Sequence, residues 1–183
     1  MRTWLAILIL IIAHTALAIA QDKHSAYSGE EKREIKALSP EEIKAYLEAQ
    51  GMGLARAAEL NHYPGPKHVL DLASELQLTE TQAQEARSSF ERMRREAARL
   101  GALIVERERE LDRLFASRQI DASKLESLTR EIARLQGELR LTHLKAHLEM
   151  RAALSDEQVK KYDHLRGYAG GGHSQHDQHN KKH

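Results

Sequence analysis

The chain of 183 residues contains no cysteine, only three prolines and only 4% aromatic residues. Without cysteine it can form no disulfide, no thiolate metal site, no iron–sulfur cluster and no c-type haem attachment. Histidine and carboxylate side chains are therefore the metal ligands to consider. The few aromatic residues, beside 30% charged residues, indicate a thin core between long amphipathic helices rather than a deep globular core.

An excess of charge of either sign is also lacking, because 28 lysines and arginines stand against 27 aspartates and glutamates. No nucleic-acid partner is therefore expected. The length predicts a single domain with tails. All three prolines lie before residue 67, so only glycine and polar loops can interrupt helices after that point.

The first twenty residues have the layout of a cleavable signal peptide. Arg2 precedes an apolar run over residues 4–12, and small residues follow at Ala16, Ala18 and Ala20. The run is shorter than the roughly 20 apolar residues of a membrane helix. We expect export and cleavage after Ala18 or Ala20, with an uncleaved anchor as the alternative.

Several short segments precede the main helical part. Residues 21–38 are polar and aperiodic, which predicts a flexible lead. Ser39 as N-cap, Pro40 as first helical residue and an acidic third position predict a helix that runs to Gln50, where Gly51 stops it. With a second helix over residues 53–60 this forms a region of short N-terminal helices, 39–62, and a further short helix is expected over residues 67–77.

Two long helices dominate the rest of the chain and predict an all-α fold. Their apolar residues recur in steps of three and four, which is typical of helices packed lengthwise, and the turn over residues 117–121 makes them an antiparallel hairpin. The first seam comprises Ala83, Ala86, Phe90, Met93, Ala97, Leu100, Ile104, Leu111 and Leu114. The second comprises Leu125, Leu128, Ile132, Leu135, Leu139 and Ala146.

Three polar or small residues interrupt this pattern. The register places Gly101 and Gly137 at one level, so either the two backbones approach closely there or each glycine only softens a surface. Arg107 is expected to pair with Glu131 at the rim of the hairpin, with a polar site as the alternative.

One motif occurs twice, as Leu78-Thr79-Glu80-Thr81-Gln82 and as Leu154-Ser155-Asp156-Glu157-Gln158. Each copy predicts a capping box, in which the hydroxyl accepts a backbone N–H bond and the glutamine reaches back to the cap residue. The motif residues are therefore given a structural role and no catalytic one. They are Leu78, Thr79, Gln82, Leu154, Ser155 and Gln158.

Two such boxes in an exported, cysteine-free helical chain resemble the Spy/CpxP family of periplasmic stress proteins, whose signature is a repeated Leu-Thr-x-x-Gln. The resemblance covers residues 60–168, and it is closest to the branch of periplasmic heavy-metal sensors. Two segments carry this closer likeness, Tyr63-Pro64-Gly65-Pro66-Lys67-His68-Val69-Leu70 and Tyr162-Asp163-His164-Leu165-Arg166-Gly167-Tyr168. It implies a helical LTxxQ-type domain over residues 63–168, a periplasmic location and a homodimer, cradle-shaped in the chaperone members. It also implies ATP-independent binding of unfolded proteins, or metal-linked signalling.

Histidines supply candidate metal ligands on the second long helix. His143 and His147 are four residues apart, which places both imidazoles on one face, and the hairpin register offers Glu96 as a third ligand. The alternative is a pair of packed, hydrogen-bonded histidines. Leu141, Leu144 and Leu148 form a second apolar stripe, which indicates a helix buried on two sides, as at a dimer interface.

The segment 169–183 predicts a disordered tail rich in glycine and histidine. His173, His176 and His179 are three residues apart and His183 ends the chain. Such a tract binds divalent metals readily, and Zn, Cu, Ni and Co are the candidates. The alternative is a solubilising tail, and no cofactor is required by either interpretation.

The sequence favours binding over catalysis. It contains no nucleophile elbow, phosphate loop or HExxH pattern, so no enzyme activity is expected. Arg92, Arg95 and Arg99 are candidate client-binding residues, although interleaved glutamates favour a solvated helix face. The first hypothesis is a periplasmic ATP-independent chaperone of unfolded envelope proteins. The alternatives are a periplasmic heavy-metal sensor or resistance protein and a modulator of an envelope-stress sensor kinase.

Overall fold

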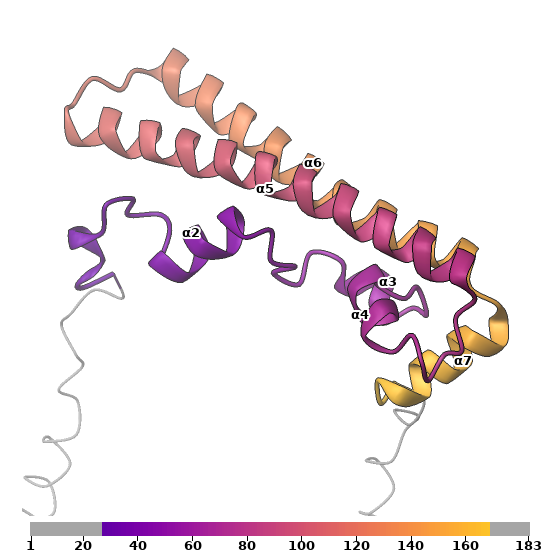
Figure 1. The fold of residues 1–183 in the computed structure, drawn as a ribbon. Coiled ribbons are helices and arrows are strands. Elements are labelled where there is room, and N and C mark those ends of the chain that lie inside the picture. Colours follow the sequence, from indigo (N-terminus) through magenta and orange to yellow (C-terminus); the bar gives the residue numbers. More distant parts are fainter. Residues whose placement is uncertain (1–26, 169–183) are drawn as a thin grey trace, which may run out of the picture. The chain divides into compact units, whose positions relative to one another are not determined.

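The computed structural model describes residues 27–168, which form helices and no strand (Figure 1). The all-α fold predicted from the sequence is confirmed, and so is the long hairpin. No helix within residues 27–168 is long and apolar enough to cross a membrane. The expected signal peptide and the histidine-rich tail lie outside the described residues. The helices are η1 (Glu30–Lys32), α2 (Pro40–Leu47), α3 (Arg56–Glu59), α4 (Pro66–Asp71), α5 (Glu80–Ala116), α6 (Ala122–Ala153) and α7 (Asp156–Leu165).

The chain divides into two compact units between Lys36 and Ala37. The described part of the first unit contains the single 3-10 turn η1, which Gly29 opens in a left-handed conformation (φ 94°). Ile35 near its end is fully buried. Of the flexible lead expected over residues 21–38, the structure describes residues 27–38.

Helix α2 begins as predicted and ends earlier. The Ser39 hydroxyl accepts the Glu42 N–H (3.1 Å), and the Glu42 carboxylate accepts the Ser39 N–H (2.8 Å). The helix stops at Leu47 because Ala49 adopts a left-handed conformation (φ 56°), and the Gln50 N–H donates to the Ala45 carbonyl (2.9 Å). This is a Schellman ending. The prediction that the helix runs to Gln50 and is stopped by Gly51 is therefore wrong by one turn.

Helices α5 and α6 pack along each other as the predicted hairpin (Figure 1). Asp121 caps α6 by accepting the Lys124 N–H (2.9 Å), and Arg107 lies 3.4 Å from Glu131, as expected for a rim pair. Leu125, nearest the turn, is exposed, so the seam is buried only away from the hairpin tip. Its buried members are Ala86, Ala97, Leu100 and Ile104 on α5 and Leu128, Ile132, Leu135, Leu139 and Ala146 on α6.

The buried side chains form two separate hydrophobic clusters. The first cluster lies where α5 and α6 meet α2, and the second lies where they meet α4 and α7. The first contains Ala97, Leu100, Ile104, Leu135 and Leu139. The second contains Val69, Leu76, Ala86, Met150, Leu154, Val159 and Tyr162. Each long helix therefore contributes to both clusters, and a stretch of each helix lies between the two clusters.

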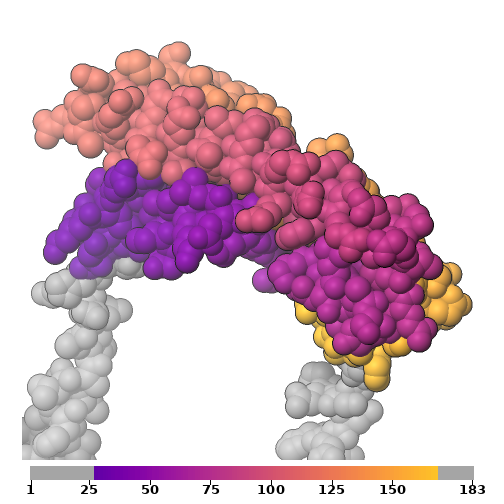
Figure 2. All heavy atoms as spheres, viewed as in Figure 1, coloured from indigo at the N-terminus to yellow at the C-terminus, as the bar shows by residue number. Residues whose placement is uncertain are grey.

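Gly101 makes a close backbone approach, although its neighbour is not the predicted one. A Cβ built on Gly101 would lie 2.2 Å from the Tyr46 carbonyl oxygen of α2, whereas a Cβ on Gly137 would meet nothing within 4 Å. Figure 2 shows the atoms of α2 packed directly against α5. Of the two interpretations, the approach of the two long helices at these glycines is therefore wrong. Gly101 makes room for α2 instead, and Gly137 faces open space.

Both copies of the repeated motif form the predicted capping boxes, at Thr79 and at Ser155. Their glutamines also bond to each other across the fold. Gln82 Nε2 donates to Gln158 Oε1 (2.8 Å), and Gln158 Nε2 donates to Gln82 Oε1 (3.0 Å). Gln82 Nε2 further donates to the Ala153 carbonyl and Gln158 Nε2 to the Leu76 carbonyl. The two motifs thus make one joint between the start of α5 and the start of α7.

Candidate metal-binding pocket

His143 and His147 occupy the stretch of α6 between the two hydrophobic clusters. Leu139 of the first cluster lies one turn before His143, and Met150 of the second lies one turn after His147. Both imidazoles are buried, with 4% and 8% of their surface exposed. Between the two clusters, the buried face of α6 therefore contains two imidazoles, those of His143 and His147.

A pocket of about 450 Å³ opens beside these histidines. Its walls are the residues after α2, the start of α4, and the facing turns of α5 and α6. His68 of α4 lines it together with His143 and His147, so three imidazoles border one cavity. Burial, together with the charge of Arg166, lowers the pKa of His68 and favours its neutral form.

The ring of His147 is held in a defined orientation. Its Nδ1 lies 2.7 Å from the carbonyl oxygen of Tyr63, which can only accept, so Nδ1 donates and the neutral ring has its lone pair on Nε2. A Cβ on Gly65 would lie 3.0 Å from that Nε2, and hence any larger residue would fill the space beside it. This arrangement matches metal-ligating histidines, in which the second nitrogen donates to a backbone carbonyl.

His143 contributes an unsatisfied nitrogen. Its Nε2 is buried and has no hydrogen-bond partner among the described residues. Burial, and then the nearby charge of His147, lower the pKa of His143, so the ring stays neutral at pH 7. A buried imidazole nitrogen left without a partner is costly, and a bound cation would relieve that cost. The alternative of a hydrogen-bonded, packed histidine pair does not describe His143 Nε2.

A carboxylate behind His147 joins three helices. Glu59 Oε1 accepts hydrogen bonds from the hydroxyls of Tyr162 (2.5 Å) and Tyr168 (3.1 Å), and Glu59 Oε2 lies 3.7 Å from His147 Nδ1. Burial, and then the bond to Glu59, raise the pKa of Tyr162 far above its usual range, so the hydroxyl remains a donor. Next to it, His62 Nδ1 lies 2.7 Å from Asp163 Oδ2.

Glu59, Gly65 and His68 are neighbours of the histidine pair that the sequence pattern did not predict. The signal was present in the two segments quoted for the family resemblance, which contain Gly65, His68, Tyr162 and Tyr168. These segments are about a hundred residues apart and meet at Glu59: Tyr162 and Tyr168 donate to its carboxylate, and a Cβ on Gly65 would lie 3.6 Å from Glu59 Oε2. Their joint occurrence reflects one packing site rather than two local patterns.

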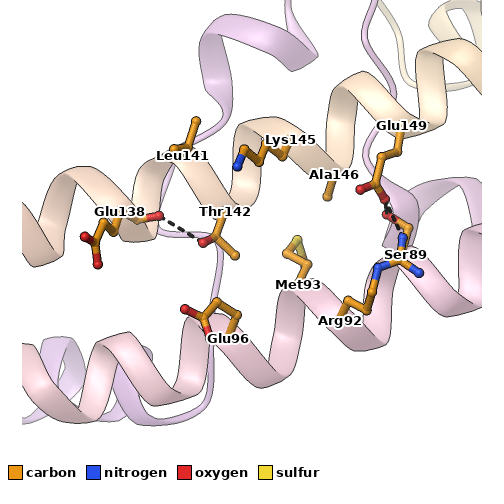
Figure 3. Close-up of a pocket in the computed structure, with 10 residues that line it drawn as sticks. All are labelled: Ser89, Arg92, Met93, Glu96, Glu138, Leu141, Thr142, Lys145, Ala146 and Glu149. Atoms are coloured by element: carbon orange, nitrogen blue, oxygen red, sulfur yellow. Dashed lines mark hydrogen bonds and ion pairs between the residues drawn. The ribbon is translucent and has the colours of Figure 1, made fainter.

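Glu96 does not join the histidines. Both of its carboxylate oxygens accept hydrogen bonds from Arg99 (2.9 and 2.6 Å), and these bonds keep the pKa of Glu96 below its ordinary value. It lines a different groove, shown in Figure 3, together with Glu138 and Leu141. Over residues 27–168, no three histidine, aspartate or glutamate side chains are grouped closely enough to hold a metal. The described residues therefore fit two ligands of a metal site and do not supply the rest.

The groove between α5 and α6 contains the first candidate client-binding arginine. It has a volume of about 350 Å³, and Arg92 pairs there with Glu149 (2.8 Å), which also accepts from Ser89 (2.5 Å; Figure 3). Arg95 lies 3.8 Å from Glu91. Since Arg99 pairs with Glu96 as well, every one of the three arginines has a glutamate partner, as in a solvated helix face.

The second apolar stripe of α6 faces solvent in the single chain. Leu141 is 49% exposed and Leu148 is 58% exposed, while Leu144 between them is partly covered. The four histidines of the tail, His173, His176, His179 and His183, lie outside the described residues.

Comparison with known proteins identifies the family. No characterised protein and no solved structure matches the chain significantly. The model of a family described as heavy-metal resistance matches residues 51–161, a span that contains the histidine pair, His68, Glu59 and both repeated motifs. Because this match covers more than half of the sequence, the chain belongs to the heavy-metal resistance family, a Spy/CpxP-like family with the LTxxQ motif.

Proposed function

We propose that the protein binds a divalent heavy-metal ion through His143 and His147 and acts in periplasmic metal resistance or sensing. The observation that carries the proposal is the pocket, into which two buried imidazoles point with a lone pair or an unsatisfied nitrogen. Membership of the heavy-metal resistance family supports it independently. The role is binding and not catalysis.

The residues of the pocket select the class of ion. Neutral imidazole suits Zn, Cu, Ni and Co, and the chain offers no thiolate that would favour softer ions. The backbone carbonyl of Tyr63 orients His147, while burial lowers the pKa of His143 and so keeps that imidazole unprotonated and free to bind.

Calorimetric titration of Zn²⁺, Cu²⁺, Ni²⁺ and Co²⁺ into the purified protein tests this proposal. We expect the variant His143→Ala/His147→Ala to weaken binding at least about tenfold, because loss of outer-shell partners alone weakens metal binding 10- to 100-fold. His164→Ala is the matched control, since His164 is exposed on α7. Unchanged affinity in the double variant would refute the assignment.

Gly65→Ala provides a sharper variant, because it leaves both histidines in the chain. Gly65 has φ −88°, which alanine adopts freely, but its Cβ would lie 2.9 Å from His147 Cε1. We expect weaker metal binding with an unchanged helical circular dichroism spectrum. Gly137→Ala adds the same methyl group at an open position and is expected to leave binding unaltered.

A second candidate function is the ATP-independent chaperone expected from the family resemblance. The specific observation in its favour is the pair of exposed leucines Leu141 and Leu148 on α6, the first of which lines the groove that contains Arg92. Such an apolar face suits an unfolded client or the partner of a homodimer. An aggregation assay decides this role: if stoichiometric protein leaves an aggregating client unaffected, with and without Zn²⁺, the chaperone function is excluded.

A further inference from the structure

The segment 59–65, which begins at the end of α3, contacts both His147 and α7. On one side, His147 Nδ1 donates to the carbonyl oxygen of Tyr63 (2.7 Å). On the other side, His62 Nδ1 lies 2.7 Å from Asp163 Oδ2 of α7. A histidine of the pocket and the last helix of the described chain therefore rest on the same short segment.

Within this segment, the carboxylate of Glu59 faces both neighbours. Its Oε1 accepts hydrogen bonds from the hydroxyls of Tyr162 (2.5 Å) and Tyr168 (3.1 Å) and lies 3.5 Å from Arg166 Nε. Its Oε2 is buried, has no hydrogen-bond partner among the described residues and lies 3.7 Å from His147 Nδ1. One oxygen is thus held by α7 and the residues after it, and the other lies beside the histidine.

The second oxygen acts on His147 through its charge. A separation of 3.7 Å is too long for a hydrogen bond, and the Nδ1–H already donates to Tyr63. A carboxylate at this distance stabilises positive charge on the imidazole, and a cation bound at Nε2 places positive charge there. Carboxylates in this position orient metal-binding imidazoles and raise their basicity. Removal of the Glu59 charge should therefore weaken metal binding although no ligand is lost.

The bonds from α7 keep this carboxylate in place. Tyr162 is fully buried, and only 13% of the Glu59 side chain is exposed. If α7 detaches, Glu59 loses both hydroxyl donors and can turn toward solvent, away from His147. The detached state then binds a cation more weakly than the docked state. By thermodynamic linkage, a bound cation favours the docked state by the same factor.

We propose that Glu59 is a positioning residue for His147 and that it couples occupancy of the metal site to the docking of α7. The inference rests on the proposed metal-binding function, because it names the residues through which that site affects the rest of the protein. Helix α7 begins with the second copy of the repeated motif, whose Gln158 bonds to Gln82 of α5. Metal binding therefore also stabilises the contact between the starts of α5 and α7.

Calorimetry with Zn²⁺ tests the positioning role. Glu59→Gln retains an oxygen for the tyrosine hydroxyls but removes the charge, so we expect about a tenfold loss of affinity. Tyr162→Phe retains the charge and removes one donor, and a smaller loss is expected. The combined variant should bind no more weakly than Glu59→Gln, because Tyr162 acts only through Glu59. Tyr46→Phe, which removes a tyrosine hydroxyl at the first cluster, is the matched control and should retain the wild-type affinity.

Hydrogen–deuterium exchange tests the coupling to α7. Saturating Zn²⁺ is expected to slow exchange over α7 at least about fivefold in the wild type, the lower end of the usual range of coupling between sites. In Glu59→Gln, saturating Zn²⁺ should leave this exchange unchanged. A purely structural role of Glu59 would alter the exchange of α7 without Zn²⁺ and would preserve the response to Zn²⁺.

The results separate this inference from the proposed function. Wild-type affinity in Glu59→Gln, or an α7 whose exchange does not respond to Zn²⁺, would overturn the coupling, while the function stands if His143→Ala/His147→Ala still loses binding. If the wild type binds no Zn²⁺, or the histidine variant binds it equally well, the proposed function fails and the coupling fails with it. Should Glu59→Gln not fold, Tyr162→Phe carries the test alone, and unchanged affinity in that variant is the contrary result.

Discussion

Burial of His143 favours its neutral form, which is the form that binds a metal ion. Burial lowers the pKa of this imidazole, so the unfolded chain takes up a proton near its ordinary value of about 6.5 while the folded chain does not. Since the unfolded state then binds more protons, the free energy of unfolding falls as the pH drops below about 6.5. The loss levels off below the lowered pKa.

We therefore expect His143→Gln to flatten this pH dependence. Urea unfolding between pH 7.5 and 5, with a chelator present to exclude metal, measures the slopes. The wild type loses more stability over this range than the variant, although His68 contributes a loss of the same sign in both. His164→Gln, at an exposed position, should retain the wild-type slope. Equal slopes in wild type and His143→Gln would contradict the lowered pKa.

We expect glycine-to-alanine substitution to have opposite effects on stability at the two helical glycines of the hairpin. Gly101→Ala places a methyl group against the Tyr46 carbonyl and is expected to cost about 1–3 kcal/mol of stability, as overpacking does. Gly137→Ala meets nothing and is expected to stabilise the protein by about 0.5–1 kcal/mol, because alanine is the better helix former. Thermal unfolding followed by circular dichroism distinguishes the two. Stabilisation by both would show that α2 does not press on Gly101.

At the scale of elements, helix starts could be predicted from the sequence better than helix ends. Ser39, Thr79 and Ser155 cap helices through side-chain oxygens, which residue types reveal. The ends of α2 and α5 rest on left-handed Ala49 and Arg118, which sequence patterns do not mark. Ala49 packs against the first cluster, while exposed Arg118 is followed by a hydrogen bond from the Gln119 N–H to the Leu114 carbonyl. Both residues adopt a conformation that glycine usually supplies, so the early end of α2 was missed.

Gln82 has two roles, capping α5 and bonding across the fold to Ala153 and Gln158, and one substitution can separate them. Gln82→Glu keeps an oxygen for the Thr79 N–H but removes the donor to Ala153 and Gln158. We expect a loss of about 1 kcal/mol, because the partners left without a hydrogen bond are only partly buried. Combined with Gln158→Ala, it should cost less than the sum of the single changes in urea unfolding. Glu42→Gln, in a box without a cross-fold bond, is the control.

At the scale of the whole molecule, the periodic pattern predicted the hairpin but not what surrounds it. The seam residues share one helix face, so the packing of the two helices along that face followed from spacing alone, although the seam is buried only away from the hairpin tip. The grouping of Glu59 on α3, His147 on α6 and Tyr168 after α7 joins distant parts of the chain, and no local pattern encodes it. For the same reason Glu96, placed by register beside the histidines, pairs instead with its own helical neighbour Arg99.

The exposed leucines of α6 predict an association between chains. We expect Leu141→Glu/Leu148→Glu to convert a homodimer into monomers without loss of helix content, because both side chains face solvent in the single chain. Analytical ultracentrifugation measures the mass. Leu165→Glu, an exposed leucine on α7, is the control that should remain dimeric. A wild type that sediments as a monomer, or a double variant that stays dimeric, would contradict this interface.

The glutamine joint also determines how the molecule can be divided. Gln82 and Gln158 satisfy each other and the carbonyls of Ala153 and Leu76, so neither motif is complete in half of the chain. A cut in the turn over residues 117–121, however, breaks none of these bonds. Two separately produced fragments should therefore recombine by complementation, while a fragment lacking α7 should not fold. The two copies of the repeated motif are thus two parts of one contact between α5 and α7, and they do not mark two independent modules.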